Sequence, residues 1–466
     1  TMALYLQQHY LACLSHASYM VGDTTSGRAV VVDPQRDISL YLDDARAHGL
    51  HITHVIETHF HADFLSGHLE LAAATGAEIV FGHSAEGRTD FPIRTMGDNE
   101  SIVLGDSADA VHLTILETPG HTPESISVVV RESQDSEPHA VLTGDTLFIG
   151  DVGRPDLLSA VGHDADTLAR QLYSSLHDKL LKLPDATLVY PAHGAGSACG
   201  KNLSTNTVST IGEQRRTNYA LAPMSIDAFV EAVTEGQAVA PLYFLFAATT
   251  NRKARENFDE DRPLAAMTVA DVRAALESGA VVLDTRDDAD FATGHLRGSV
   301  NVGLGGRFAE YAGEVIEPGR SIVIVAEPGK EREAMIRLAR IGFDSVIGYL
   351  DDPVRSFIEN PDAVAIASRL TATEFALRRN DVPGLQLVDV RGPGEFRLGT
   401  ISGAQHIELA ALTRHLDQLD PHRPVVVFCA GGYRSSIAAS TLRSRGFDDV
   451  SDIIGGYNAW SSLVTA

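Results

Sequence analysis

The chain has 466 residues, of which 44% are hydrophobic, and its 62 acidic against 37 basic residues give a formal net charge of −25. This length suits about three domains of ordinary size, and the composition excludes a disordered or collagen-like chain. The negative charge repels phosphate backbones and anionic lipid headgroups, so neither nucleic acid nor a membrane is expected as a partner.

We expect no membrane span and no secretion signal. The longest apolar run, residues 238–248, is interrupted by Pro241, and a span needs roughly 18 residues or more. The first residues lack the basic start and apolar core of a signal peptide, so a cytoplasmic location is expected. Three cysteines (Cys13, Cys199 and Cys429) are too few and too far apart for a disulfide framework, so a functional cysteine would act as a thiol.

The first 200 or so residues alternate β-branched runs with amphipathic stretches, which predicts a mixed α/β domain. Strands are expected at the apolar runs 29–32, 55–56, 126–130 and 187–190, and helices at 40–48 and 166–183. The charged segment 251–262 has few large apolar residues and is expected to be a linker or a solvated face.

The rest of the chain contains a repeat. The segment 281–286 (Val-Val-Leu-Asp-Thr-Arg) returns about a hundred residues later as 387–391 (Leu-Val-Asp-Val-Arg), and the apolar runs 322–326 and 425–428 also correspond. Two copies of one small α/β unit, at residues 263–365 and 366–466, explain this pattern. Strand–helix alternation at this spacing predicts a parallel sheet with helices on both faces.

A cluster of histidine and aspartate residues follows the apolar pair 55–56. In an extended segment alternate residues project to one side, so His59, His61 and Asp63 would converge at a strand end. Further candidate ligands stand beside glycines in turns after apolar runs: His121, Asp145 and His193. Each such loop position leaves backbone room for a metal ion.

The order His-x-His-x-Asp, Gly-His, Gly-Asp and a last His resembles the metallo-β-lactamase superfamily over about residues 1–250. The resemblance implies a sandwich of two sheets with helices outside and a metal site at one edge.

Residue 64 distinguishes two branches of this superfamily. The dinuclear hydrolases, glyoxalase II among them, carry a histidine there that holds a second metal, whereas this chain has Phe64, which cannot ligate a metal. A second metal ion is therefore disfavoured, although Asp63 and His193 remain as possible ligands for one. One metal held by two histidines and a carboxylate leaves positions for substrate and O₂, as in non-haem Fe(II) oxygenases.

The domain most resembles the persulfide dioxygenase branch. That resemblance implies one Fe(II) per chain, held by His59, His121 and Asp145, with zinc as the alternative metal. It places three further side chains around the ligands, where they orient them or guide protons: His61, Asp63 and His193.

Two more residues are candidates near this centre. Arg154, in the stretch 148–156 that also resembles the branch, is a candidate for binding the thiol-bearing substrate, and a structural pair with Asp156 is the alternative. Cys199 lies six residues after His193 in a loop of small residues and is a candidate functional thiol that could reach the metal.

A second site is predicted around Cys429, which follows a β-branched strand and precedes a helix expected at 437–445. Successive backbone N–H groups and the positive helix end stabilise a thiolate and a bound anion in such a loop. The spacing Cys-x₄-Arg resembles the rhodanese sulfurtransferases, although their usual Gly-His-Ile turn is Gly-Thr-Ile here. The resemblance implies that Cys429 carries sulfur, while the anionic donor is bound by the loop residues Gly431, Gly432, Tyr433 and Arg434.

The first copy of the repeat has no such cysteine, because its corresponding segment 326–331 reads Ala-Glu-Pro-Gly-Lys-Glu. We interpret residues 263–365 as an inactive rhodanese-like domain that acts as a spacer or docking surface.

The complete order resembles the bacterial fusions of a persulfide dioxygenase with a sulfurtransferase. It implies oxidation of a small thiol persulfide, based on glutathione, coenzyme A or a similar thiol, by O₂ to sulfite and free thiol. Cys429 would make or use thiosulfate, in sulfide detoxification, and a homo-oligomer is expected. The alternatives are a zinc-dependent thioester hydrolase like glyoxalase II and a sulfur relay through the rhodanese domain only.

Overall fold

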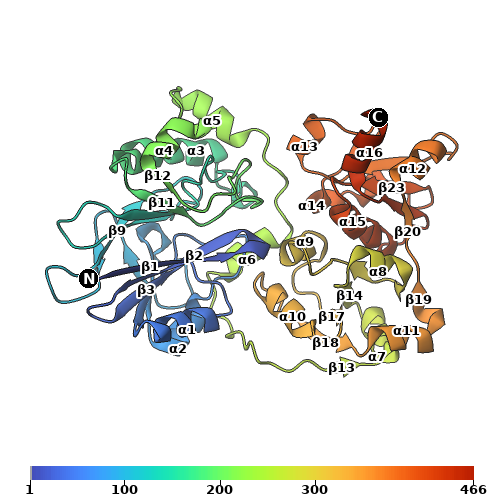
Figure 1. Ribbon diagram of the computed structural model, residues 1–466, viewed down its shortest axis with the longest axis horizontal. Helices are drawn as coiled ribbons and strands as arrows, with labels where there is room; N and C mark the ends of the chain where they lie inside the picture. Colours follow the sequence, from blue (N-terminus) through green and yellow to red (C-terminus); the bar gives the residue numbers. More distant parts are fainter. Residues whose placement is uncertain (1–2, 466) are drawn as a thin grey trace. The chain divides into compact units, whose positions relative to one another are not determined.

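The computed structural model describes residues 3–465, which divide into two units (Figure 1). Residues up to 237 together with 245–259 form the first unit, and residues 238–244 with those from 260 onward form the second.

Two mixed sheets form the centre of the first unit. The first sheet has the strand order β1 (Leu4–Leu11), β2 (His16–Asp23), β3 (Arg28–Val32), β4 (His51–Ile56), β5 (Glu78–Gly82), β6 (Arg94–Met96). The second sheet has the order β12 (Ser209–Thr210), β11 (Leu188–Pro191), β10 (Ala140–Gly144), β9 (Ile126–Arg131), β8 (His112–Glu117), β7 (Ser101–Val103). The helices up to residue 250 are α1 (Ser39–Ala47), α2 (His68–Thr75), α3 (Ala165–Ser174), α4 (Ile211–Thr217), α5 (Ile226–Thr234) and α6 (Tyr243–Thr250).

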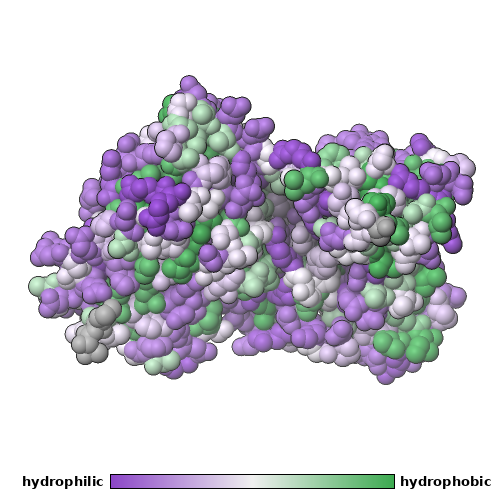
Figure 2. All heavy atoms as spheres, turned by 45° about the horizontal axis from the view of Figure 1, so that its top comes forward, coloured by the Kyte–Doolittle hydropathy of each residue, from purple (hydrophilic) through white to green (hydrophobic). Residues whose placement is uncertain are grey.

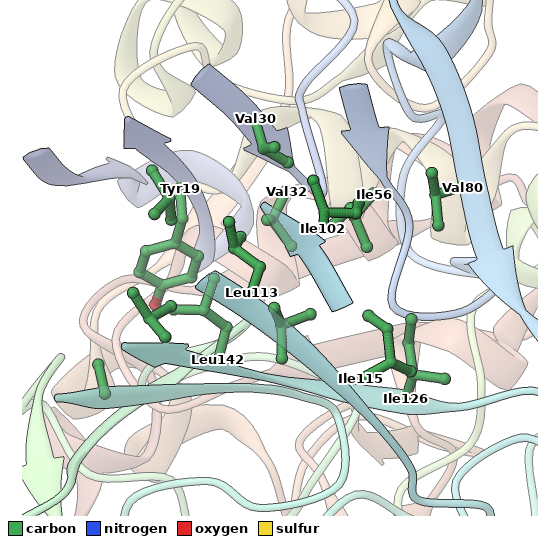
Figure 3. Close-up of a cluster of buried hydrophobic side chains, with 14 of the residues drawn as sticks. Tyr19, Val30, Val32, Ile56, Val80, Ile102, Leu113, Ile115, Ile126 and Leu142 are labelled. Atoms are coloured by element: carbon green, nitrogen blue, oxygen red, sulfur yellow. The ribbon is translucent and has the colours of Figure 1, made fainter. Parts of the chain in front are cut away.

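The main core lies between the two sheets (Figure 3). Val30 and Val32 of β3 face Leu113 and Leu142 of the other sheet within one cluster, whereas Val31 belongs to the cluster that packs under α1 and α2. This alternation is the two-residue period of a strand buried on both faces. The helices α3 and α5 cover the outer face of the second sheet, so the predicted sandwich with helices outside is confirmed.

The helix expected at 166–183 is only partly regular. The α-helix α3 ends at Ser174, and the chain continues as a π-helical turn at Ser175–Lys179 and a 3₁₀ turn at Leu180–Lys182. The sequence carries no signal for this change, because Leu176 and Leu180 keep the apolar spacing of a helix and are both buried.

The charged segment expected as a linker contacts the first unit. The amide of Asn251 donates hydrogen bonds to the backbone oxygens of His61 (2.8 Å) and Phe64 (2.9 Å). The guanidinium of Arg255 pairs with the buried carboxylate of Glu70. Residues 251–259 therefore belong to the unit that holds the histidine cluster.

The second unit contains two parallel five-stranded sheets of identical topology. The first has the order β13 (Ala266–Met267), β18 (Val346–Leu350), β17 (Ile322–Val325), β14 (Val281–Asp284), β16 (Val300–Asn301), and the second has β20 (Ser368–Leu370), β24 (Val450–Ile453), β23 (Val425–Phe428), β21 (Gln386–Asp389), β22 (Gln405–His406). A short antiparallel pair joins β15 (His295–Leu296) to β19 (Val364–Ala365). The tandem repeat read in the sequence is thus present as two copies of one sheet.

Helices accompany both sheets. Those of the first copy are α7 (Val269–Glu277), α8 (Asp288–Thr293), α9 (Phe308–Val315), α10 (Glu331–Ala339) and α11 (Pro353–Glu359). Those of the second are α12 (Ala372–Arg378), α13 (Pro393–Arg397), α14 (Leu409–Leu412), α15 (Tyr433–Ser444) and α16 (Gly456–Thr465). The helix α15 begins four residues earlier than expected from the apolar pattern, directly at the end of the cysteine loop.

The surface drawn in Figure 2 is largely hydrophilic, with hydrophobic residues in small scattered groups. None of the helices within residues 3–465 combines the length and the apolar character that a membrane crossing requires.

Candidate functional site

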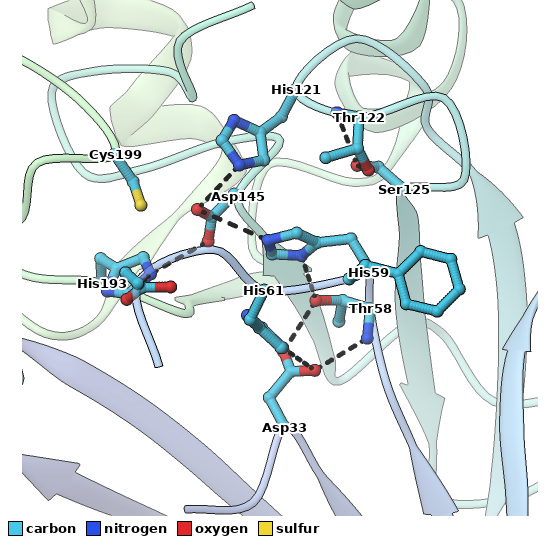
Figure 4. Close-up of polar contacts among 12 residues, drawn as sticks. Asp33, Thr58, His59, His61, His121, Thr122, Ser125, Asp145, His193 and Cys199 are labelled. Atoms are coloured by element: carbon cyan, nitrogen blue, oxygen red, sulfur yellow. Dashed lines mark hydrogen bonds and ion pairs between the residues drawn. The ribbon is translucent and has the colours of Figure 1, made fainter. Parts of the chain in front are cut away.

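The first candidate site lies where three strands of the first unit end. His59 follows β4, His121 follows β8 and Asp145 follows β10, and all three side chains are buried. One ligand atom from each lies within 4.8 Å of the others (Figure 4). The Nε2 atoms of His59 and His121 are 3.8 and 3.3 Å from Asp145 Oδ2.

Hydrogen bonds fix which ring nitrogen of each histidine faces the cluster. The Thr58 hydroxyl donates to Asp33 (2.8 Å), so it accepts from His59 Nδ1 (3.0 Å). His121 Nδ1 donates to the backbone oxygen of Arg154 (2.9 Å). A neutral imidazole carries one proton, so both Nε2 atoms present a lone pair to the cluster.

The protonation preferences of the cluster suit metal binding. Burial lowers the pKa of His121 to about 4 and, with the neighbouring histidines, lowers the pKa of His59 well below its usual value. Burial raises the pKa of Asp145 to about 6. His59 Nε2 is buried without a hydrogen-bond partner among the described residues. Two neutral nitrogen donors and a buried carboxylate without a hydrogen-bond partner among the described residues fit a divalent metal ion.

The Nε2 atom of His61 points away from the three candidate ligands and toward two other carboxylates. That atom lies 2.9 Å from Asp33 Oδ1 and 3.2 Å from Glu57 Oε2. Burial opposes a charge on His61, but the two carboxylates outweigh it and raise the pKa well above the usual value. Asp33 and Glu57 therefore favour the protonated form of His61, next to the ligands.

Phe64 occupies an apolar position beside the cluster. Its ring centroid lies 4.0 Å from that of His16 and 4.4 Å from that of His61. The side chain is buried and fills space with carbon atoms, which is the role that its sequence position implied.

A second group of potential ligands adjoins the first. Ligand atoms of Asp63, His193 and Cys199 lie within 4.8 Å of one another. His193 donates from Nδ1 to Ser15 O (3.0 Å), and its Nε2 atom lies 3.2 Å from Asp63 and 3.4 Å from Asp145. The structure thus brings His193 and Asp63 against Asp145.

Cys199 is buried in this group, as Figure 4 shows. Burial and the carboxylates of Asp63 and Asp145 raise the pKa of its thiol well above the usual value. The loop of small residues after His193 therefore does reach the cluster, with a thiol that prefers to stay protonated.

Arg154 contributes to the first site through its backbone oxygen. Its guanidinium makes two hydrogen bonds of 2.7 Å to Asp156, and its backbone oxygen holds His121. This geometry favours the structural alternative for the Arg154 side chain.

The second candidate site surrounds Cys429, the first residue after β23. The Gly432 N–H donates to Cys429 Sγ (3.1 Å), and the thiol lies 3.5 Å from the Ser435 hydroxyl. Gly432 has a φ of 112°, which glycine adopts without strain. The loop then enters α15, so its N–H groups and the helix end lie beside the sulfur.

Arg434 is held beside the loop by a carboxylate. It makes hydrogen bonds of 2.7 and 2.8 Å to the two oxygens of Glu395, near the start of α13. Burial opposes the charge of Glu395, but Arg434 outweighs it and lowers the pKa of that carboxyl. An incoming anion would therefore share Arg434 with Glu395.

Sequence reasoning missed several residues of the first site. Asp33, Glu57, Thr58 and His16 are all buried around the histidine cluster. Asp33 adopts a positive φ of 51°, which costs energy in a residue other than glycine. The sequence signal for Asp33 was its position directly after the apolar run 29–32, at the same edge of the sheet as His59.

A two-sheet sandwich with a His/Asp cluster at its strand ends, followed by two parallel-sheet repeats, defines the class of this protein. The profile of the metallo-beta-lactamase superfamily matches residues 11–193, and that of the rhodanese-like domain matches residues 268–359 and 371–463.

Individual relatives narrow the class. The mitochondrial persulfide dioxygenase ETHE1 of Bos taurus is 30% identical over 242 residues, 51% of this chain and 83% of that protein. The hydroxyacylglutathione hydrolase of Polaromonas sp. is 36% identical over 176 residues, 38% of this chain and 61% of that protein. A solved metallo-beta-lactamase structure from Staphylococcus aureus is 30% identical, with a TM-score of 0.67 over 74% of this chain and 98% of its own.

The chain therefore belongs to the persulfide dioxygenase family within the metallo-β-lactamase superfamily, with two rhodanese-like domains fused behind it. It is an enzyme of sulfur metabolism with a metal cofactor.

Proposed function

We propose that residues 1–250 oxidise a low-molecular-weight thiol persulfide with O₂ at a single Fe(II) held by His59, His121 and Asp145. One persulfide, one O₂ and one water give the free thiol, hydrogensulfite and one proton. Residues 366–466 transfer sulfur through Cys429, and residues 263–365 form the cysteine-less domain between them, joined by the segment 251–262. The role would be the removal of sulfide-derived sulfur.

The observation that supports this proposal best is the donor set. Two neutral histidine nitrogens and one carboxylate converge in a buried site, while His61 is engaged by Asp33 and Glu57, and Phe64 replaces a possible ligand. Two histidines and one carboxylate leave open positions for a substrate and O₂, and Fe(II), when bound there, supplies the redox chemistry.

The surrounding residues orient the ligands and manage the proton. Thr58 and the Arg154 backbone fix the ring orientation of His59 and His121. His193 Nε2, between Asp63 and Asp145, is placed to accept the proton that the balanced reaction releases.

Cys429 is proposed to complete the sequence of sulfur chemistry. In its persulfide form, the terminal sulfur is attacked by sulfite, the S–S bond breaks, and the products are thiosulfate and the Cys429 thiolate. The Gly432 N–H, which donates to Sγ at 3.1 Å, stabilises the thiolate as leaving group. The reverse reaction would load Cys429 from thiosulfate.

The test is O₂ consumption by protein loaded anaerobically with Fe(II), started with glutathione persulfide or coenzyme A persulfide. We expect uptake with one sulfite formed per O₂, and no uptake by a matched zinc-loaded sample. Failure with both persulfides would contradict the proposal.

The same zinc-loaded sample tests the main alternative. The hydroxyacylglutathione hydrolase relative supports a thioester hydrolase, in which metal-bound hydroxide attacks the substrate. Cleavage of S-lactoylglutathione by the zinc sample, without O₂ uptake by the iron sample, would favour that function. The absence of both activities, with sulfur transfer retained, would favour the relay through Cys429 only.

A further inference from the structure

Tyr433 connects the cysteine loop to the cysteine-less domain. It is the first residue of α15 and follows Gly432, whose N–H donates to Cys429 Sγ. A displacement of residue 433 therefore shifts the backbone group that contacts the sulfur.

The side chain of Tyr433 leaves its own domain. Its hydroxyl donates a hydrogen bond of 2.5 Å to the backbone oxygen of Gly303, which lies between β16 and α9. Its ring packs edge-on against Tyr311 of α9, with 5.5 Å between ring centroids. A residue of the active loop is thus held by two elements of the other repeat.

Gly306 makes the closest approach to the Tyr433 ring. A Cβ atom at position 306 would lie 2.6 Å from Tyr433 Cζ, which real side chains do not tolerate. At Gly305, the preceding residue, a Cβ would meet no atom within 4 Å. A side chain at position 306 would therefore clash with Tyr433, whereas one at position 305 would not.

The contact lies beside the segment of the cysteine-less domain that corresponds to the Cys429 loop. Tyr433 forms part of the wall of a cavity of about 450 Å³, together with Thr285 after β14 and Glu327 after β17. Glu327 stands in the segment that corresponds to the Cys429 loop.

Further contacts fix α15 to the same domain. The Ser436 hydroxyl donates to the Asn301 side chain (3.0 Å), and the Asn301 N–H donates to the Ser440 hydroxyl (2.9 Å). These three residues are buried. The first two turns of the helix that follows Cys429 are therefore bound on one side to β16.

We propose that the cysteine-less domain is a positioning element of the Cys429 site, with Tyr433 as the positioning residue that sets the loop geometry around the sulfur. In the first repeat, the region that corresponds to the Cys429 loop holds Tyr433, a residue of the active loop of the second repeat. This inference rests on the proposed function only in taking Cys429 as the sulfur carrier.

The experiment compares Gly306→Ala with the matched control Gly305→Ala in the full chain. The rate of Cys429 alkylation by iodoacetamide is followed by peptide mass spectrometry, and kcat and KM for sulfur transfer from thiosulfate are measured beside it. We expect Gly306→Ala to slow alkylation and lower kcat about fivefold, the ratio that corresponds to the loss of one ordinary hydrogen bond. Gly305→Ala should match the parent in both.

A double variant shows whether the effect acts through the tyrosine. In a Tyr433→Ala background, Gly306→Ala should add no further change, because the clash partner is gone. Tyr433→Phe, which keeps the ring and removes only the hydrogen bond to Gly303, should also slow alkylation in a chain with an unchanged thermal midpoint. It serves as the test if Gly306→Ala does not fold.

Equal alkylation rates for Gly306→Ala and Gly305→Ala, or an unchanged rate in Tyr433→Phe, would overturn the inference. Alkylation of Cys429 does not depend on sulfur transfer. If Cys429 of the parent chain is alkylated but the chain transfers no sulfur, the proposed function is contradicted. The comparison of alkylation rates would still decide the positioning inference.

Discussion

At the residue scale, hydrogen-bond partners set the ring orientation of the histidines of the first site, and two of the three partners are distant in the sequence. Ser15 O accepts from His193 Nδ1, Arg154 O accepts from His121 Nδ1, and Thr58 accepts from His59 Nδ1. Each hydrogen bond leaves Nε2 without the ring proton, and in the proposed function the Nε2 atoms of His59 and His121 bind the metal. Partners of this kind orient ligands and increase their basicity.

Asp145→Asn tests the carboxylate of the donor set. The amide is a weaker ligand without charge, so iron per chain after reconstitution should fall from about one to below about a tenth of that value. Metal analysis measures this content.

The thermal midpoint separates lost binding from lost folding in this variant. The raised pKa of Asp145, about 6, means that its stabilising contribution is present at low pH and lost as the pH rises through 6. Without bound metal, the variant should therefore be at least as stable as the metal-free parent at pH 7.5. Asp109→Asn, at an exposed position, should keep its iron, and a full iron content in Asp145→Asn would exclude this residue as a ligand.

At the scale of elements, α9 places a buried acid at the interface of the two repeats. Burial, followed by the neighbouring Glu310, raises the pKa of Glu314 well above its usual value. The folded state therefore holds the Glu314 proton more tightly than the unfolded state. Glu314 stabilises the fold at low pH, and this contribution is lost as the pH rises through its folded pKa.

Glu314→Gln removes this titration with little change in shape. We expect the stability of the variant relative to the parent to increase as the pH is raised from 5 to 8, because only the parent loses the contribution of the protonated Glu314 carboxyl. The midpoint of thermal unfolding of the second unit, followed at both pH values, measures the difference. Glu277→Gln, at an exposed site of the same repeat, should give no pH-dependent gain, and an equal response of the two variants would contradict the assignment.

At the scale of the whole molecule, two candidate sites lie on separate folds in one chain. The donor set of the first unit and the cysteine loop of the second share no residue. In the proposed function, fusion would keep the product of one site at high local concentration for the other.

Cys429→Ser should separate the two activities. Sulfur transfer from thiosulfate to cyanide requires the thiolate and should disappear, while O₂ uptake with a small persulfide should stay within about twofold of the parent. An oxygen electrode and a thiocyanate assay measure the pair. Loss of both activities in a folded, iron-loaded variant would show that the sites do not act independently. Cys13→Ser should leave both unchanged.

Local patterns made much of this protein predictable. The His-x-His-x-Asp segment, the Cys-x₄-Arg loop and the repeated Asp-x-Arg strand ends are short stretches whose spacing fixes where side chains project. The family resemblance carried by the first of these stretches implied the sandwich, and the strand–helix alternation of the repeat predicted the two parallel sheets. The topology confirms both. The identity of the candidate ligands required no long-range information.

The tertiary structure decided how those residues are used, because the deciding contacts join distant segments. The family resemblance places His61 beside the metal ligands, yet Asp33, 28 residues away, and Glu57 determine where its Nε2 points. Tyr433 lies in the cysteine loop, yet its hydroxyl meets Gly303, 130 residues earlier. Spacing in the sequence determines which side chains share a strand end, whereas their hydrogen-bond partners and charges are set by packing between segments that only the folded chain brings together.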